Sequence, residues 1–345
     1  MVKVLVIGGS GFIGPHVVRR LQQQGHELAV FHRGSTPAPA GVTEFRGDRN
    51  RLDAQAEQLR AFRPDVVIDV ILSSSRQAEQ LISIFRGTVG RVVVVSSIDV
   101  YRAVGVLHGL EPGPLEPVPL TEESPLRTVF HPYPPESLKL LQKVFAWVDD
   151  AYDKIPVERA IRGAPGLTAT IIRLPMVYGP GDPLHRFLPI VKRVDENRPA
   201  IIISEGMAQW RAARGYVENV AEAIVLAATA DRAAGRVYHV ADQENFSELE
   251  WTQVIAAAAG YRGKLVVLPD ERTPKHLLLP GNTAQHWSAD STRIRQELGY
   301  IEKVPHEEAI RRTIAWERTH VPAGPLPYQF DYAAEDAALQ SAHKN

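Results

Sequence analysis

The 345-residue sequence predicts an α/β protein: a doubly wound parallel sheet followed by a smaller C-terminal α/β region. Short β-branched runs alternate with helical patterns over the first two thirds of the chain, which is typical of a parallel sheet covered by helices on both faces. The first run, KVLVIG at residues 3–8, leads directly into closely spaced glycines and then into a helical pattern. These observations indicate one bilobed unit that opens with a βαβ unit.

The strands expected in the sheet are rich in β-branched residues and bounded by turn signals. They cover residues 3–8, 27–33, 65–71, 91–97 and 168–174. Between the first two, Val17, Val18 and Leu21 recur at helical spacing, and Gly25 ends that helix. The run VVVV within 91–97 is short and β-branched, so we expect a buried strand there and not a core helix.

Residues 1–180 are expected to form the first domain, interrupted by a proline-dense excursion at about residues 102–136. Long loops in compact domains are usually functional or disordered, and the aromatic and leucine content of this one favours order near a site. Residues 181–330 are expected to form an interleaved substrate-binding region. It contains strand-like and helical runs at residues 199–204, 219–229, 235–242, 248–260 and 306–319. The tail, residues 331–345, is expected to be frayed.

The composition is that of an ordinary globular protein, with 44% hydrophobic and 23% charged residues. A net charge of −1 gives no general attraction for nucleic acid or anionic membranes, so neither is an expected partner. The absence of cysteine excludes disulfides, thiolate metal sites and a cysteine nucleophile, and it fits a reducing cytoplasm. No apolar stretch approaches the ~18–20 residues needed to span a bilayer, and no signal-peptide core is seen. We therefore expect a cytoplasmic protein.

The glycines after the first strand predict a dinucleotide site. Gly9, Gly11 and Gly14 fit G-x-G-x-x-G, and Gly8, Gly11 and Gly14 fit G-x-x-G-x-x-G. Glycine permits the tight turn and the close approach of the backbone to a pyrophosphate, which then lies at the helix N-terminus. Because the motif follows a strand and opens a helix, it is more than a glycine-rich turn. The residues expected to hold the cofactor in this Rossmann-type loop are Gly8, Gly9, Ser10, Gly11, Phe12, Ile13 and Gly14.

The end of the second strand predicts which dinucleotide binds. Proteins made for NAD usually carry Asp or Glu about 20 residues past the glycines, to grip the ribose 2′-OH. This chain has His32 and Arg33 there, so no carboxylate repels a 2′-phosphate and a guanidinium can pair with one. We expect NADP(H), with NAD as the alternative; a solvated arginine without a role is the simpler interpretation of Arg33.

Several motifs in order resemble the NAD-dependent epimerase/dehydratase group of the extended short-chain dehydrogenase/reductase superfamily. They are GGSGFIG at residues 8–14, RGD ending at Asp48, VVVVSSIDVY at 92–101, IIRLPMVYGPGD at 171–182 and RGYVENVAEAI at 214–224. The resemblance covers roughly residues 3–320. It implies that Asp48 contacts adenine and that Ser97 orients the substrate oxygen. Further cofactor contacts implied by it are Ile71, Leu72, Ser96, Lys154, Pro175 and Val177.

The family's catalytic helix carries Y-x-x-x-K followed four residues later by Glu, and this chain matches only the second half. Lys154 and Glu158 fit, but Asp150 stands where the tyrosine is expected and Tyr152 lies two residues before the lysine. Helix positions four apart share a face, whereas positions two apart differ by about 200°. On a regular helix, Tyr152 would point away from Lys154.

Three alternatives for the chemistry stay open. Tyr152 acts as general acid/base if the helix starts late, since Pro156 disturbs its hydrogen bonding. Asp150 replaces the phenol only if burial raises its pKa, which is ordinarily near ~3.9. In the third alternative no tyrosine-type chemistry survives. FHRG at the second strand's end and VVIDVIL at 66–72 are similar to atypical members such as chloroplast stem-loop-binding proteins, so a non-catalytic NADP-sensing or RNA-interacting regulator is the alternative to an enzyme.

On the substrate side, Tyr178, His185 and Arg186 follow the motif that borders the nicotinamide and are expected pocket walls. Arg214, with Arg211 nearby, is expected to clamp a phosphate or carboxylate, although a solvent-facing pair is equally simple. The resemblance implies a small polar substrate, of which a nucleotide-linked sugar is the commonest kind, and a homodimer. His131 and Tyr133 are candidates for a lid. None of the 12 histidines has a metal-site spacing, so no metal is expected.

Overall fold

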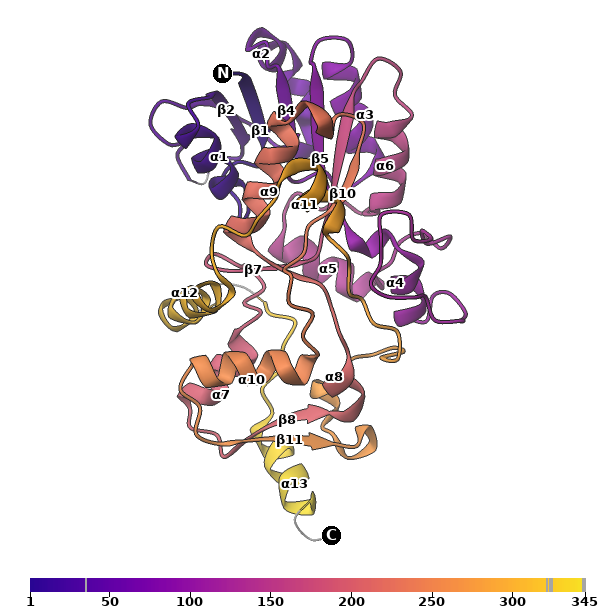
Figure 1. Ribbon diagram of the computed structural model, residues 1–345, viewed down its shortest axis with the longest axis vertical. Helices are drawn as coiled ribbons and strands as arrows, with labels where there is room; N and C mark the ends of the chain where they lie inside the picture. The colour runs from indigo at the N-terminus through magenta and orange to yellow at the C-terminus, as the bar shows by residue number, and fades with distance from the viewer. Residues whose placement is uncertain (35, 321, 323–324, 343–345) are drawn as a thin grey trace.

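The computed structural model describes residues 1–34, 36–320, 322 and 325–342, and it forms two lobes stacked along the long axis of the molecule (Figure 1). The larger lobe holds a seven-stranded sheet in the order β10-β6-β5-β4-β1-β2-β3, and every paired strand in it is parallel. The doubly wound α/β fold class predicted from the sequence is confirmed. The strands of this sheet are β1 (Lys3–Ile7), β2 (Glu27–His32), β3 (Thr43–Arg46), β4 (Val66–Asp69), β5 (Arg91–Ser97), β6 (Ala169–Leu174) and β10 (Val237–His239).

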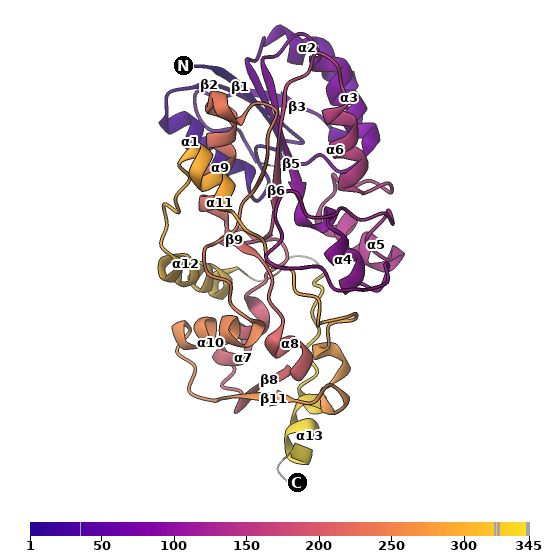
Figure 2. The same ribbon diagram turned by 45° about the vertical axis from the view of Figure 1, so that its right-hand side comes forward.

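Helices cover both faces of the sheet, as Figure 2 shows. One face packs against α1, α9 and α11, and the other against α2, α3 and α6, so the apolar core is divided into two layers. The α-helices of this lobe are α1 (Gly14–Gln23), α2 (Ala56–Ala61), α3 (Ser75–Phe85), α4 (Arg102–Leu107), α5 (Pro135–Val144), α6 (Lys154–Arg162), α9 (Val217–Thr229) and α11 (Thr292–Leu298). No helix within the described ranges is long and apolar enough to cross a membrane.

The sheet's strands are buried on both faces, which explains why they read as continuous β-branched runs. The exception is the edge strand β3, whose sequence TEFR lacks an apolar run because its side chains are only half-buried or exposed. It pairs with β2 from Ala29↔Thr43 to His32↔Arg46 and was not predicted from the sequence. An edge strand with one neighbour needs no apolar pattern, and so it leaves little signal.

The chain returns to the larger lobe after residue 180. Strand β10 pairs with β6, and α9 packs against α1, so the predicted division near residue 180 marks a crossing point and not a boundary in space. Two further strands, β7 (Met176–Tyr178) and β9 (Arg214–Tyr216), pair in parallel where the chain passes between the lobes.

The proline-dense excursion is ordered by buried charged side chains. The carboxylate of Glu111 accepts hydrogen bonds from the backbone N–H groups of Thr128 (2.6 Å) and Val129 (3.0 Å). Arg127 is buried and pairs with Asp153 at 3.2 Å. These contacts fix a segment that has no regular structure between α4 and α5 except isolated bridges.

The smaller lobe is built on a two-stranded parallel sheet, and a C-terminal helix packs against it. The strands are β8 (Ala200–Ser204) and β11 (Lys264–Leu268), and the helices are α7 (Leu188–Asp195), α8 (Glu205–Gln209), α10 (Glu248–Ala258), α12 (His306–Thr319) and α13 (Tyr332–Ala342). Short 3₁₀ helices occur along the whole chain and not in this lobe alone. They are η1 (Arg49–Gln55), η2 (Ile98–Val100), η3 (Asp231–Ala233), η4 (Asp270–Arg272) and η5 (Lys275–Leu277).

The expectation of a frayed tail was wrong for residues 332–342, which form α13, and its last part, residues 343–345, lies outside the described residues. Glu335 on α13 is fully buried and pairs with Arg193 of α7 and with His276 at 3.1 Å. Leu339 adds an apolar contact to the same core. The sequence gives no periodic apolar stripe in this helix, because its attachment depends on an ion pair.

Glu335→Ala is expected to lower the free energy of unfolding by about 3–5 kcal/mol, because it leaves the buried Arg193 guanidinium without its partner. The neighbouring Asp336, which is half-exposed and pairs with Arg198, is the matched control, and Asp336→Ala is expected to cost less than about 1 kcal/mol. Urea titrations followed by circular dichroism measure both. Equal losses in the two variants would show that the buried pair does not hold α13.

Candidate functional site

A cleft of about 590 Å³ opens at the carboxyl ends of the parallel strands, where ligands bind in open α/β sheets. Its wall is contributed by Gly8 after β1, Arg33 after β2, Ile71 after β4, Ser97 at the end of β5 and Pro175 after β6. The predicted cofactor residues that line it are Gly8, Ser10, Gly11, Phe12, Ile13, Gly14, His32, Arg33, Asp48, Ile71, Ser96, Lys154, Pro175 and Val177. Gly9 and Leu72 lie behind the wall.

The glycine loop joins β1 to α1 by an approach that only glycine permits. Gly8 has φ +89°, and a Cβ on Gly14 would stand 2.0 Å from the Gly8 carbonyl oxygen. A Cβ on Gly11 would meet nothing closer than 3.9 Å, so this side of the loop is open toward the cleft. Helix α1 has no side-chain cap at Ile13. Pro15 carries no N–H and the His16 N–H donates to the Ile13 carbonyl at 3.1 Å, so the Gly14 N–H is the group at the helix start that is available to an anion. The loop therefore fits a pyrophosphate.

Arg33 and Asp48, the residues expected to meet the adenosine part of the cofactor, both line the cleft and are exposed. Arg33 forms no ion pair with any residue that the structure describes. His32 lies behind it, buried, with Nε2 at 2.8 Å from Glu44 and Nδ1 without a partner within the described residues. The guanidinium of Arg33 is thus accessible to a phosphate group at the ribose.

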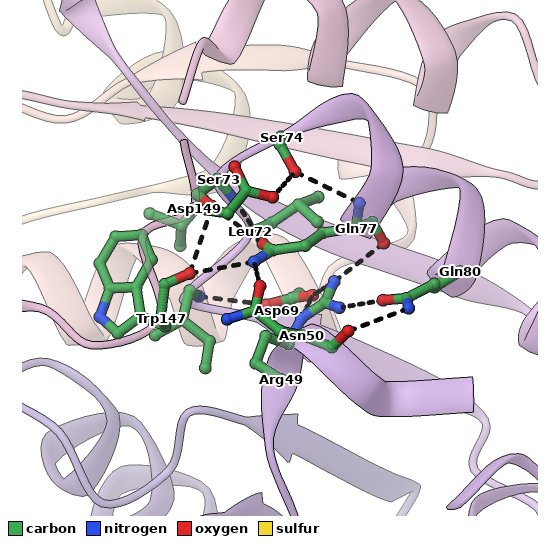
Figure 3. Close-up of polar contacts among 12 residues, drawn as sticks. Arg49, Asn50, Asp69, Leu72, Ser73, Ser74, Gln77, Gln80, Trp147 and Asp149 are labelled. Atoms are coloured by element: carbon green, nitrogen blue, oxygen red, sulfur yellow. Dashed lines mark hydrogen bonds and ion pairs between the residues drawn. The ribbon is translucent and has the colours of Figure 1, made fainter. Parts of the chain in front are cut away.

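A buried polar network ties the end of β4 to α3 and to residues 147–149 (Figure 3). Arg49 donates to Asp69 Oδ2 through Nε (3.0 Å) and Nη2 (2.7 Å), and Nη2 also donates to the Gln77 carbonyl (3.0 Å). The Gln77 amide nitrogen donates in turn to the Trp147 carbonyl at 2.9 Å. Asp149 accepts from Ser74 Oγ at 2.5 Å. This network holds Trp147 at the rim of the cleft, and no sequence motif predicted it.

Helix α6 begins at Lys154, later than a regular Y-x-x-x-K helix requires. Asp153 has an extended backbone (φ −164°, ψ 128°), and its carboxylate caps the helix by accepting from the Ile155 N–H at 2.9 Å. Tyr152 therefore precedes the helix, and the 200° rotation between helix positions does not apply to it. Tyr152 and Lys154 both line the cleft, with Lys154 Nζ at 5.7 Å from the Tyr152 ring centroid.

The buried carboxylate of Asp153 also attaches this turn to its surroundings. It accepts from Arg127 Nη2 at 3.2 Å and from the His131 N–H at 2.7 Å, both in the proline-dense excursion. The Asp153 N–H donates to the Ser73 carbonyl at 3.1 Å. His131, a suggested lid residue, is itself exposed, whereas Tyr133 reaches the cleft.

Lys154 is buried and donates from Nζ to the carbonyls of Leu72 and Val95, the latter at 3.1 Å. Burial lowers the pKa of its ammonium to about 8. Because Lys154 lines the cleft beside Tyr152, its position fits a ribose and nicotinamide bound there.

Asp99 binds the hydroxyl groups of two tyrosines that line the cleft. It is fully buried, and its Oδ2 accepts from the hydroxyls of Tyr152 (3.0 Å) and Tyr133 (3.2 Å). Its Oδ1 has no partner among the described residues. Burial raises the pKa of the Asp99 carboxyl, and burial together with this carboxylate holds the pKa of the Tyr152 phenol well above its ordinary value. Sequence reasoning missed Asp99, although it lies two residues after Ser97.

The other predicted catalytic residues are divided between the cleft and the surface. Ser97 lines the cleft, where its Oγ accepts from the Asp99 N–H at 3.1 Å. The Ser96 hydroxyl instead donates to Glu158 at 2.6 Å. Asp150 is exposed, accepts from Gln142 at 2.8 Å and does not line the cleft. A surface carboxylate in that place cannot replace the phenol, so the structure does not support Asp150 as a catalytic residue.

Of the four predicted substrate residues, only Arg186 lines the cleft. Tyr178 is buried in an aromatic cluster, stacked on Phe187 with ring centroids 5.4 Å apart. His185 is buried, with Nδ1 at 2.7 Å from Glu317. These two side chains serve packing, so the structure does not support them as pocket walls.

The predicted arginine clamp is likewise not brought to the cleft. Arg214 is buried, pairs with Glu248 and lies over the Trp251 ring, while Arg211 pairs with Glu250 at 3.0 Å. Neither is available to an anionic substrate in this arrangement, because each already faces a carboxylate. A sequence shows the arginines but not the partners that the fold supplies.

An open glycine loop on an uncapped helix, an accessible guanidinium at the second strand and a lysine beside a tyrosine define a dinucleotide-dependent enzyme on a Rossmann-type sheet. The chain belongs to the NAD-dependent epimerase/dehydratase family, whose sequence pattern matches residues 4–125 and 152–241. Its relatives include a reductase, a dehydratase and an epimerase, and the chain is an NAD(P)-dependent enzyme. They also include a chloroplast stem-loop binding protein of Arabidopsis thaliana, which is 27% identical over 33% of this chain and 34% of its own length.

Individual proteins agree with this assignment. The 2'-dehydrokanamycin reductase of Streptomyces kanamyceticus is 30% identical over 80% of this chain and 72% of its own length. Among solved structures, the UDP-glucose 4-epimerase of Thermus thermophilus in complex with NAD has a TM-score of 0.63 at 24% identity, covering 92% of this chain and 100% of that one. The UDP-glucose 4-epimerase of Thermotoga maritima with UDP-glucose has a TM-score of 0.64 at 20% identity, covering 92% and 99%.

Substitutions at two glycines of the loop are expected to separate folding from cofactor binding. Gly14→Ala is expected to lower the melting temperature of the cofactor-free protein, because its Cβ would overlap the Gly8 carbonyl oxygen. Gly11→Ala is expected to leave that temperature nearly unchanged but to weaken dinucleotide binding, since its methyl group points to open space. Thermal melts and calorimetric titrations with NADPH measure the two effects. Equal melting temperatures for both variants would contradict this account of the loop.

Proposed function

We propose that the protein is an NADP(H)-dependent oxidoreductase that reduces a carbonyl group to a secondary alcohol and catalyses the reverse oxidation. The observation that carries the proposal is that Ser97, Tyr152 and Lys154 line the same cleft. Asp99 bridges the first two, because it accepts from the Tyr152 hydroxyl at 3.0 Å and its N–H donates to Ser97 Oγ at 3.1 Å. The late start of α6 brings Tyr152 there in spite of its shifted place in the sequence. The reductase activity named for the Streptomyces kanamyceticus relative supports the same reaction type.

The preference for NADP(H) over NAD(H) is supported by Arg33. An accessible guanidinium at the end of β2 matches a 2′-phosphate, and charge-assisted hydrogen bonds of this kind are short and strong. Asp48 lies farther along the same wall, where a carboxylate can accept from an adenine amino group. The bound nicotinamide supplies or accepts the hydride.

The protein's own contribution to the reaction is orientation and proton transfer. Because the phenol of Tyr152 stays protonated at neutral pH, it is in the state that a proton donor to a carbonyl oxygen requires. Ser97 Oγ, at the same end of the cleft, hydrogen-bonds that oxygen. Lys154 would hold the ribose of the bound cofactor. Its ammonium, 5.7 Å from the centroid of the Tyr152 ring, favours negative charge on the phenol as its proton leaves.

Asp99 completes the proton path. In the structure Tyr152 donates its hydroxyl hydrogen to Asp99 Oδ2 at 3.0 Å. Once its carboxyl is protonated, Asp99 would donate to the Tyr152 oxygen instead, and the phenolic hydrogen would be free to turn toward the substrate. As the phenol gives its proton to the substrate oxygen, the proton of Asp99 passes to the phenol. The Asp99 carboxylate later takes up a new proton from solvent. A protonated Asp99 is favoured by its burial, which raises the pKa of the carboxyl.

Asp99→Asn is expected to lower kcat for carbonyl reduction by about 100-fold, because an amide can donate a hydrogen bond to Tyr152 but cannot release a proton. The wild-type rate should fall as pH rises through the raised pKa of Asp99, and this limb should vanish in the variant. Steady-state pH profiles measure both. Asp150→Asn, at the exposed neighbouring carboxylate, is the control and should keep the wild-type profile; an unchanged profile in Asp99→Asn would exclude the relay.

Arg33→Ala is expected to weaken NADPH binding about 10- to 100-fold, the range of a hydrogen-bonded ion pair, and to leave NADH binding unchanged. Arg162→Ala, at an exposed arginine near the end of α6 and outside the cleft, is the control. Calorimetric titrations with each dinucleotide measure the effect. Tighter binding of NADH than NADPH by the wild-type protein would refute the assignment of NADP(H).

A further inference from the structure

We propose that the substrate of this enzyme is an uncharged ketone or secondary alcohol with an apolar body, and not a nucleotide-linked sugar. The inference rests on the proposed oxidoreductase function and names the substrate class of the same cleft. Three features of the described residues carry it: the pairing of the cations, the aromatic rings around Tyr152 and the apolar face of α5.

The cations of the cleft are arranged so that one end binds phosphate and the other does not. The described lysines and arginines that line it are Arg33, Arg49, Lys154 and Arg186. Arg49 is buried against Asp69, and Lys154 is buried and donates to two backbone carbonyls. Arg33, which is exposed, lies where the adenosine part of the cofactor is expected, and its guanidinium would pair with the 2′-phosphate.

Arg186 is the remaining cation and the nearest to the expected substrate. Its Nη1 lies 2.7 Å from Asp182 Oδ1 and donates to the Val177 carbonyl at 2.8 Å. Asp182 is buried, so the pair adds no net charge to this end of the cleft. A diphosphate placed here would lose its hydration without gaining an uncommitted cation, and burying an unpaired charge is costly.

Aromatic rings surround the reacting groups. The ring of Tyr133 lies 5.7 Å from that of Tyr152, and the ring of Trp147 lies 5.7 Å from Lys154 Nζ. Trp287 donates from Nε1 to the carbonyl of Ile98, next to Ser97, at 3.3 Å. All three rings line the cleft, so a carbonyl group held at Ser97 and Tyr152 has flat apolar surfaces around it.

Helix α5 (Pro135–Val144) supplies an apolar surface that no core covers. It is amphipathic, yet none of its residues is buried, and its Leu141 and Val144 line the cleft together with Phe145 just beyond its end. An apolar helix face normally packs against a core. Here the face is turned to the cleft, and an apolar substrate is the occupant that would cover it.

The position of this wall is fixed by the network of Figure 3. The Trp147 carbonyl accepts from Gln77 Nε2 at 2.9 Å and from Ser73 Oγ at 3.3 Å, and Asp149 is held by Ser74. These bonds use the backbone of Trp147 and leave its indole ring to the cleft. The apolar wall is therefore anchored independently of its side chains, and the Trp147 ring can be removed without breaking the anchor.

A series of methyl ketones tests the inference. With NADPH, kcat/KM is expected to rise about fourfold for each added methylene from butanone through 2-hexanone to 2-octanone, the gain from burying each group in an apolar site. The charged comparison substrates are 2'-dehydrokanamycin, tested as a carbonyl compound with NADPH, and UDP-glucose, which has no carbonyl group to reduce and is therefore tested as an alcohol with NADP⁺ against 2-octanol. Both should be converted far more slowly. Calorimetric titration of the same ketones into the NADP⁺ complex should show the same increase in affinity.

Trp147→Ala is expected to reduce the gain per methylene and to raise KM for 2-octanone more than for butanone, with NADPH affinity unchanged. Phe130→Ala removes an aromatic ring that is 42% exposed and does not line the cleft. This control variant should show the same gain in kcat/KM per methylene as the wild-type protein. Affinity and kcat/KM that do not depend on ketone length, or faster conversion of either charged substrate, would overturn the inference.

Failure of the proposed function has a different signature. A protein that binds no NADPH in calorimetry, or binds it and reduces none of these carbonyl compounds, is not the oxidoreductase proposed above. In the second case, an increase in ketone affinity with chain length for the NADP⁺ complex would still support the apolar substrate site, and its absence would refute that site as well.

Discussion

The capping of helix α6 by Asp153, which makes the helix begin at Lys154, is the constraint on which the rest of the site depends. One buried carboxylate caps the helix at Ile155, accepts from Arg127 and His131 in the proline-dense excursion, and so fixes two segments far apart in the sequence. Because the backbone at the cap residue, Asp153, is extended, Tyr152 lies before the helix, and its hydroxyl donates to Asp99. The altered spacing of the tyrosine and lysine is thereby compensated by a local change in backbone.

Buried carboxylates do similar work elsewhere in the molecule. Asp69 holds Arg49 below the cleft, Glu158 holds Arg173 behind β5 and β6, and Glu335 attaches the last helix through Arg193. Such pairs contribute little net stability compared with apolar packing, but leaving one partner alone is costly, so they specify which segments meet. This explains how long irregular segments keep a defined course beside the sheet.

The cleft combines a conventional cofactor half with an unusual substrate half. The glycine loop follows the family, and the close approach of Gly8 to Gly14 leaves little freedom in how β1 joins α1. The opposite half is formed by α5, by Trp147 and by Trp287, which come from segments that the family motifs do not cover. Fold and cofactor loop therefore follow from common sequence features, whereas these walls of the opposite half come from segments outside the family match.

The sequence by itself determined the doubly wound sheet, the cofactor loop and the positions of five strands along the chain, because buried parallel strands and a glycine turn leave local, contiguous signals. Only the tertiary structure decided that Tyr152 and not Asp150 meets Lys154, that Asp99 joins them, and that Tyr178, His185 and Arg214 are engaged elsewhere. The physical reason is that a polar side chain's role depends on its partner, and those partners lie far away in the chain: His185 pairs with Glu317, and Tyr152 with Asp99.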